Sequence, residues 1–159
     1  MSPRKAPDRA SDMEADFSYS LPDGGAGLSA LLDALEAALA ARDVPPTAAT
    51  AILISADEIV SNVLGHGGSP AVEVSARIAD GSVTVTVVDD GPAFDPLAAE
   101  TPDTTLSIEA RDIGGLGIHL VRKLMDEVDY RRDGKHNRLR FSKSFAPPSP
   151  PRPSADEPY

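Results

Sequence analysis

Apolar and polar residues alternate almost strictly through residues 82–89. Successive side chains of a β-strand point to opposite faces, so this run predicts a strand whose apolar face is formed by Val83, Val85, Val87 and Asp89. Asp89 therefore points where valines are buried, and Asp90 points the opposite way. A buried carboxylate is costly unless hydrogen-bond donors surround it. Either the turn that follows supplies those donors, or the carboxylate is reserved for a ligand.

Helical spacing dominates the chain before this strand. Leucines at positions 28, 31, 32, 35 and 39 predict a helix over residues 28–41. A second helix is predicted from Pro46, whose fixed φ suits a first helical turn, to about Leu64, where several glycines follow. A short strand over residues 17–21 precedes both helices.

Strands dominate the rest of the chain. A strand over residues 71–78 is joined to the strand 82–89 by Asp-Gly, a dipeptide typical of two-residue hairpin turns. The segment after that hairpin, up to Ile113, has no sustained period, which is typical of a functional loop. A helix from Gly115 or Leu116 to Met125 follows, and the last elements are strands near 127–132 and 138–144 around a turn at 133–135.

The order of these elements predicts the fold class. Strand, two helices, two strands, a long loop, a helix and two strands indicate an α/β (α+β) two-layer sandwich, with helices on one face of a mostly antiparallel sheet. This domain is expected to span residues 17–145. Residues 1–16 and 146–159 are predicted to be disordered tails, because the first lacks periodicity and the second is rich in proline.

Composition and charge restrict the class of protein. The chain has 159 residues, no cysteine and a formal net charge of −10. The length suits one core, and the absence of cysteine excludes disulfides and thiolate metal sites. The negative charge argues against direct nucleic-acid binding, which needs a basic surface. The N-terminus is charged and no apolar run reaches about 20 residues, so we expect a cytoplasmic protein without a membrane span.

Glu58 and Asn62 lie four residues apart in the second predicted helix, so their side chains share one face. They border an apolar stripe formed by Ile52, Ile59 and Val63. The pair is either a solvated helix flank or part of a site. In a site, the carboxylate could deprotonate a hydroxyl, and the carboxamide oxygen could bind a hard cation such as Mg²⁺.

Glycines dominate residues 113–118, which lead into the third predicted helix with the sequence Ile-Gly-Gly-Leu-Gly-Ile. Glycines let backbone amides approach an anion closely, and a helix N-terminus offers unpaired N–H groups and the positive end of the helix dipole. The segment is therefore either a phosphate cradle or a hinge at the end of the long loop.

Three motifs, taken in order, resemble the nucleotide-binding boxes of the GHKL ATP-binding superfamily of gyrase, heat-shock chaperone and histidine kinase. They are Glu58-x-x-x-Asn62, Asp89-x-Gly91 and Gly115-x-Gly117. Residues 89–96 and 114–128 look more closely similar to the anti-sigma-factor serine/threonine kinases of the RsbW type. The resemblance covers about residues 17–144 and implies the Bergerat ATP-binding fold. One departure is Gly65, where family members often carry a basic residue before a histidine.

The resemblance implies roles for the first two motifs. Glu58 would be the catalytic base toward a serine hydroxyl of a partner protein. Asn62 would coordinate Mg²⁺ at the phosphates, and so would be the metal ligand. Asp89 would accept a hydrogen bond from the adenine amino group, and Gly91 would leave room for the base.

Roles for the third motif and the long loop follow from the same resemblance. The backbone amides of Gly115, Leu116 and Gly117 would bind the phosphates. Residues 92–113 would form the ATP lid, and Arg111 near its end would add a weaker phosphate contact.

The function implied is that of an ATP- and Mg²⁺-dependent protein serine/threonine kinase acting as an anti-sigma-type regulator. Its partners would be a sigma factor and a small anti-anti-sigma antagonist of the STAS type, which it would phosphorylate. A homodimer is a further expectation of the resemblance. The alternative is a non-catalytic, ATP-sensing adaptor that binds these partners without phosphoryl transfer. Glu58 favours the kinase, because a protein that only binds has little need of a base there.

Overall fold

The structure is a computed structural model that describes residues 15–21, 27–65, 71–98 and 115–145. These residues form five strands, three α-helices and one turn of 3₁₀ helix. In chain order they are β1 (Phe17–Leu21), α2 (Leu28–Ala41), α3 (Pro46–Gly65), β2 (Val72–Ala79), β3 (Ser82–Asp89), η1 (Pro96–Ala98), α5 (Gly115–Leu124), β4 (Glu127–Asp133) and β5 (His136–Ser144). The predicted tails lie outside the described residues, apart from residues 15 and 16.

The sheet is antiparallel throughout, with the strand order β1-β2-β3-β5-β4. Tight turns set the register of both hairpins. Asp80 and Gly81 have positive φ, as a two-residue type I′ turn requires, and they bring Ala79 opposite Ser82. The predicted Asp-Gly hairpin is therefore confirmed. In the second hairpin, Gly134 also has positive φ.

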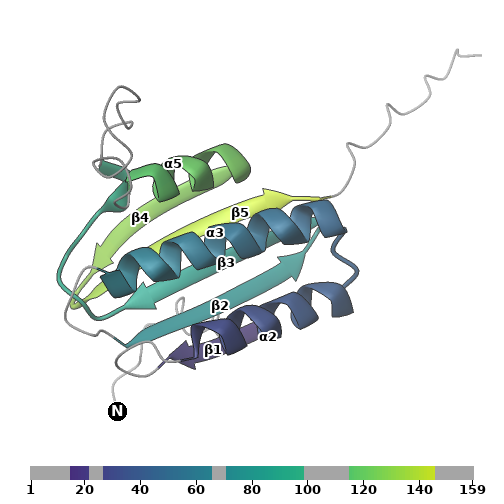
Figure 1. Cartoon of the computed structure of the whole chain (residues 1–159), viewed down its shortest axis with the longest axis horizontal. Helices are drawn as coiled ribbons and strands as arrows, with labels where there is room; N and C mark the ends of the chain where they lie inside the picture. The colour runs from purple at the N-terminus through teal and green to yellow at the C-terminus, as the bar shows by residue number, and fades with distance from the viewer. Residues whose placement is uncertain (1–14, 22–26, 66–70, 99–114, 146–159) are drawn as a thin grey trace, which may run out of the picture.

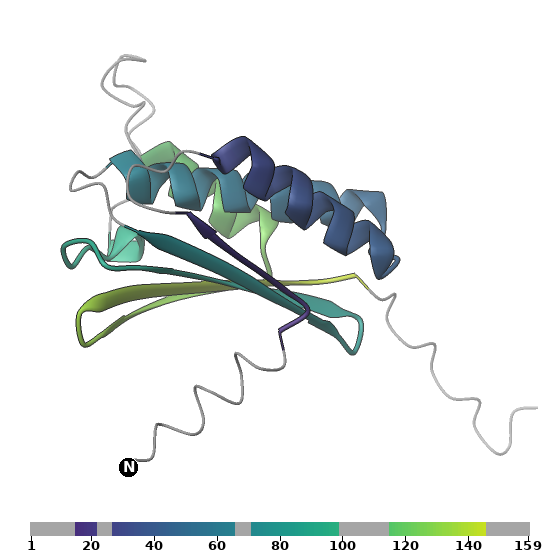
Figure 2. The same cartoon turned by 90° about the horizontal axis from the view of Figure 1, so that it is seen from below.

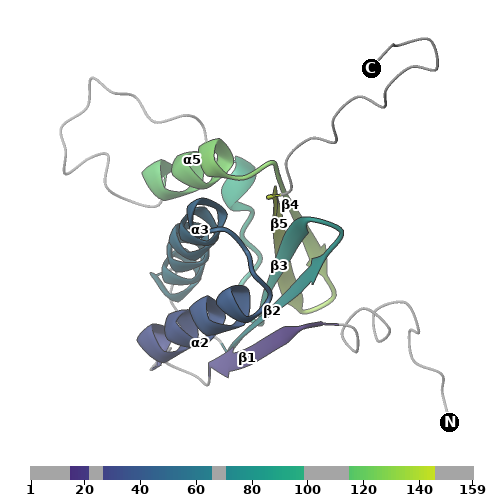
Figure 3. The same cartoon turned by 90° about the vertical axis from the view of Figure 1, so that its right-hand side faces the viewer.

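Helices cover one face of this sheet, and no described helix lies on the other (Figures 1 and 2). Figure 1 shows α3 running along the middle of the sheet, between α2 and α5. The side view in Figure 3 shows the two layers, one of helices and one of strands. The predicted two-layer α/β sandwich is confirmed, and α3 is the helix that can reach both the sheet and its two neighbours.

The core lies between α3 and the central strands. Ile52, Ile59 and Val60 of α3 are buried, and so are Val83, Val85 and Val87 of β3. By length and composition alone α3 could span a membrane, since its mean hydropathy is 1.3 over 18 residues. Its position explains this composition, because the helix packs on the sheet between two other helices, and 39% of that window is buried inside the protein.

Two differences from the predicted elements bear on the site. β5 begins at His136, two residues earlier than expected, because the turn before it contains only Gly134 and Lys135. The short helix η1 was not predicted, since three residues are too few to show a helical period. The other predicted bounds agree with the structure to within one residue.

Candidate functional site

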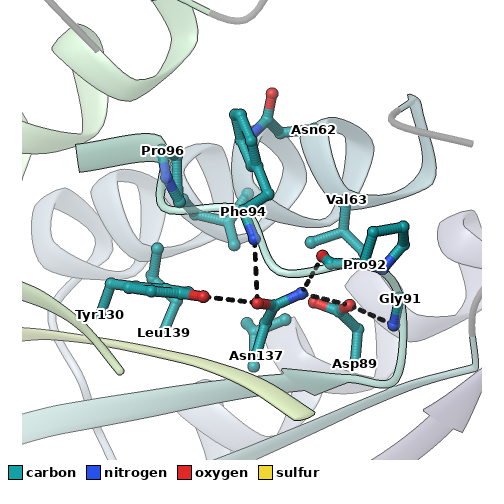
Figure 4. A pocket seen from close by; sticks show the side chains of 12 residues that line it. Asn62, Val63, Asp89, Gly91, Pro92, Phe94, Pro96, Tyr130, Asn137 and Leu139 are labelled. Atoms are coloured by element: carbon teal, nitrogen blue, oxygen red, sulfur yellow. Dashed lines mark hydrogen bonds between the residues drawn. The ribbon is translucent and has the colours of Figure 1, made fainter. Parts of the chain in front are cut away.

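A pocket opens between α3 and the sheet at the end of β3 (Figure 4). It encloses about 450 Å³ of empty space, counting the part open to solvent. Its walls are mostly apolar with a few polar groups. They comprise Ile59, Asn62, Val63, Val87, Asp89, Gly91, Pro92, Phe94, Pro96, Tyr130, Asn137 and Leu139. Three predicted site residues, Asn62, Asp89 and Gly91, therefore line one cavity.

Asp89 is the last residue of β3 and is buried, with 5% of its surface exposed. Its Oδ1 accepts hydrogen bonds from the Gly91 backbone N–H at 2.8 Å and from the Asn137 side-chain amide at 3.0 Å. Its Oδ2 has no hydrogen-bond partner among the described residues. Both readings of this carboxylate therefore have a physical basis, because one oxygen is bound by the turn and the other is left for the pocket.

Glu58 and Gly117 are in contact across the α3–α5 interface. A Cβ atom built on Gly117 would lie 2.5 Å from Oε1 of Glu58, which is closer than real Cβ contacts. Only glycine therefore fits at this position without moving the carboxylate. The half-buried Glu58 does not line the pocket of Asp89, but it lies against the first turn of α5, in the glycine-rich motif.

The N-terminus of α5 is formed by the rest of this motif. Gly115 and Leu116 are its first two helical residues, so their backbone N–H groups are among those that a helix leaves without an intrahelical partner. Such groups favour anions. Arg111 and residues 99–113 of the predicted lid lie outside the described residues.

The described start of the predicted lid is attached to α5. Residues 92–98 run from the end of β3 into η1, where the Leu97 N–H donates to Asp95 Oδ1 at 2.9 Å. The Arg122 guanidinium of α5 donates to the Leu97 carbonyl at 2.6 Å. The first residues of the lid are thereby connected to the helix that the glycine motif begins.

Comparison with known protein families identifies the group to which this arrangement belongs. Residues 21–143 match the family described as histidine kinase-like ATPase domain. The chain belongs to this family. Serine/threonine-protein kinase BtrW of Bordetella bronchiseptica is 29% identical over 102 residues, which cover 62% of this chain and 72% of that protein. The expected GHKL resemblance, to kinases of the anti-sigma-factor type, is thus confirmed.

A solved structure supports the fold of this family member. The RsbU and RsbW domains of Rv1364c from Mycobacterium tuberculosis match with a TM-score of 0.58 and 16% sequence identity. The match covers 84% of this chain but 34% of that one, so this chain spans about a third of the larger structure. At this identity the likeness concerns the fold alone.

Asn137 is a site residue that the sequence analysis missed. It is buried, with 7% of its surface exposed, and its register partner is Asp89. The predicted strand began one residue after it, so its place on the core face was not recognised. Counting back by twos from Phe141 through Leu139 would have placed Asn137 on the apolar face of its strand.

Proposed function

We propose that this chain is an ATP-dependent protein serine/threonine kinase that acts as an anti-sigma-type regulator. The observation that carries the proposal is the contact between Glu58 and Gly117. It joins a carboxylate suited to general-base catalysis to a glycine-rich helix start suited to phosphate binding. The name of the relative BtrW, a serine/threonine-protein kinase, supports the same reaction.

The residues present fit ATP. One carboxylate oxygen of Asp89 has no hydrogen-bond partner in the described part of the chain and lies at an apolar pocket, which suits the amino group of adenine. Gly117 has no room for a side chain where backbone amides would approach phosphates. Gly115, Leu116 and Gly117 would bind the phosphates, and Arg111 would add a contact from the lid.

The residues also fit a magnesium ion that travels with the nucleotide. Asn62 lines the Asp89 pocket and offers one carboxamide oxygen. Within the described residues there is no group of three or more His, Cys, Asp or Glu side chains that could hold a metal. Mg²⁺ commonly takes one or two protein ligands and completes its shell with phosphates and water. Asn62 would supply that protein ligand.

MgATP would provide the phosphoryl group and neutralise charge that develops during transfer. Glu58 would accept the proton of the attacking serine hydroxyl, and the amides at the start of α5 would hold the phosphates in place. The protein's part would thus be positioning and proton transfer, which is what phosphoryl transfer requires of a kinase.

The proposed partners are a sigma factor and a small STAS-type antagonist whose serine receives the phosphate. The protein would act in the cytoplasm, as a homodimer, and without direct contact to nucleic acid. The net charge of −10 is consistent with the last point.

One experiment tests the reaction. The full chain is incubated with γ-labelled ATP, Mg²⁺ and a panel of purified STAS-type domains, and ATP affinity is measured separately by calorimetry. We expect label on a serine of one or more domains, and no label when that serine is replaced by alanine. If ATP binds and no domain is labelled, the kinase proposal is wrong and the chain is an ATP-sensing adaptor.

Substituting alanine for Gly117 should impair transfer without unfolding the protein. The new methyl group would displace the Glu58 carboxylate, which lies 2.5 Å from the Cβ position. Because a displacement of about 1 Å can slow a reaction by roughly 10²-fold, we expect a decrease in transfer rate of about tenfold or more. The thermal midpoint should not decrease, since alanine favours a helix over glycine.

Gly65→Ala is the matched control for this variant. It makes the same change at the end of α3, where nothing lies within 4 Å of the added Cβ. The control should transfer phosphate at the wild-type rate. A wild-type rate in Gly117→Ala would show that transfer does not depend on the observed position of Glu58.

A further inference from the structure

The Asn137 side chain makes five hydrogen bonds. As a donor, its Nδ2 binds Asp89 Oδ1 at 3.0 Å and the Pro92 carbonyl at 2.8 Å (Figure 4). A carboxamide nitrogen carries two N–H groups. Both are therefore used within the protein, one on the buried carboxylate and one on the turn that follows it.

Residues of β4 and of the loop after β3 donate to the other end of this carboxamide. Asn137 Oδ1 accepts from the Tyr130 hydroxyl at 2.6 Å, from the Phe94 N–H at 3.2 Å and from the Arg132 guanidinium at 3.2 Å. Because three donors surround this atom, it must be the amide oxygen, and the other end of the carboxamide must be the NH₂ group. The Nδ2 group is consequently held toward Asp89, although the residue is on a different strand.

This orientation gives the two carboxylate oxygens of Asp89 different roles. Oδ1 receives N–H groups from Gly91 and Asn137, so its hydrogen-bonding capacity is used. Oδ2 keeps no described partner. A carboxylate held by two donors on one oxygen cannot rotate freely, and the acceptor that remains has a fixed position at the pocket.

We propose that Asn137 is a positioning residue for base recognition. By holding Asp89 Oδ1, it presents Oδ2 as a fixed acceptor to the exocyclic amino group of a 6-aminopurine nucleotide. Asn137 itself does not contact the base, because both of its N–H groups are committed to the protein. The inference rests on the proposed ATP binding and adds the source of its selectivity for an amino-bearing base.

The test compares two nucleotides in the full-length protein. They are ATP and purine riboside triphosphate, which lacks only the 6-amino group. A hydrogen bond to a charged acceptor typically changes affinity by about 10- to 100-fold, so wild type should prefer ATP by a factor in this range. In Asn137→Asp, which replaces both donors by an acceptor of the same shape, the preference should fall to about threefold or less.

Two further variants make the result specific. Asn137→Ala removes the donors without adding charge and should lose the preference in the same way, even if Asn137→Asp does not fold. Arg140→Ala removes an exposed side chain of the same strand that does not line the pocket, so it should keep the wild-type preference. Circular dichroism and thermal melting establish folding for each variant.

The outcomes separate the inference from the function on which it rests. If both nucleotides lose affinity by the same factor in the Asn137 variants, the residue is merely structural and the inference is wrong. A wild-type preference that persists in these variants also overturns it, while ATP binding stands. If the wild-type protein binds neither nucleotide, the proposed function fails and the inference fails with it.

Discussion

Glu58→Gln is expected to slow phosphoryl transfer to the antagonist serine by roughly 10²–10⁴-fold, the usual contribution of a general base. Glutamine has nearly the same shape as glutamate but cannot accept the hydroxyl proton. ATP affinity should change by less than about threefold, because Glu58 does not line the pocket that contains Asp89. The measurement is a single-turnover transfer assay with the antagonist domain in excess.

The position of Glu58 explains why replacing one carboxylate oxygen by an NH₂ group is expected to slow transfer so much. Its carboxylate lies against Gly117, at the first turn of α5. A base that already lies where phosphates would bind needs little reorganisation before it acts. Glutamine would occupy the same space against Gly117, and the protein should melt at a similar temperature.

Asp57→Asn is the matched control for Glu58→Gln. It removes one negative charge from the adjacent position of α3, where the Asp57 carboxylate accepts a hydrogen bond from Ser61 at 3.2 Å. The atoms nearest the Cβ position of Gly117 all belong to Glu58 and none to Asp57. This control should transfer phosphate at nearly the wild-type rate. An equal decrease of the transfer rate in the two variants would assign the effect to the charge of the helix. A wild-type transfer rate in Glu58→Gln would exclude Glu58 as the general base.

Local patterns in the sequence were sufficient to predict most of the fold. β3 was predicted with its observed bounds, because one face is apolar at every second position and the Asp-Gly turn before it has strong conformational preferences. The helix α2 was also predicted with its observed bounds, from leucines at helical spacing. Both signals are local, so they do not depend on knowing what packs against them.

Contacts between distant residues could not be predicted in this way. The motifs gave reasons to suspect Glu58 and Gly117 separately, but their contact, which leaves no room for a Cβ atom on Gly117, depends on how α5 packs against α3. Asn137 was missed for a related reason. A turn one residue shorter than expected extends β5 toward its N-terminus, and this places a carboxamide opposite Asp89. Register across a sheet is therefore what determines the polar end of the pocket.

Asp89→Asn should change which bases the pocket accepts, and this is the second large effect that we expect. The Gly91 and Asn137 N–H groups both donate to Oδ1 of Asp89. In the variant they would retain the amide oxygen at that place, so the new NH₂ group would face the pocket. A donor would then oppose the amino group of adenine. Leaving such a group unpaired costs about 1–3 kcal/mol, so ATP affinity should fall by roughly 10- to 100-fold.

The same exchange of acceptor for donor predicts a gain in affinity for a nucleotide with a different base. Inosine triphosphate carries a carbonyl oxygen in place of the 6-amino group, and this acceptor would match the NH₂ of the variant. The ratio of ATP to inosine triphosphate affinity, measured by calorimetry, should therefore invert in Asp89→Asn. General damage to the pocket would weaken both nucleotides and leave their ratio unchanged.

Asp90→Asn provides the control, because Asp90 is the exposed neighbour of Asp89 and its Oδ1 accepts the Ala71 N–H at 2.9 Å. Asparagine can keep that bond, so this variant should bind both nucleotides as the wild type does. If Asp89→Asn binds ATP with wild-type affinity, Oδ2 of Asp89 does not receive the adenine amino group. The buried carboxylate would then serve only the turn at Gly91, and the base would have to be read by other residues of the pocket.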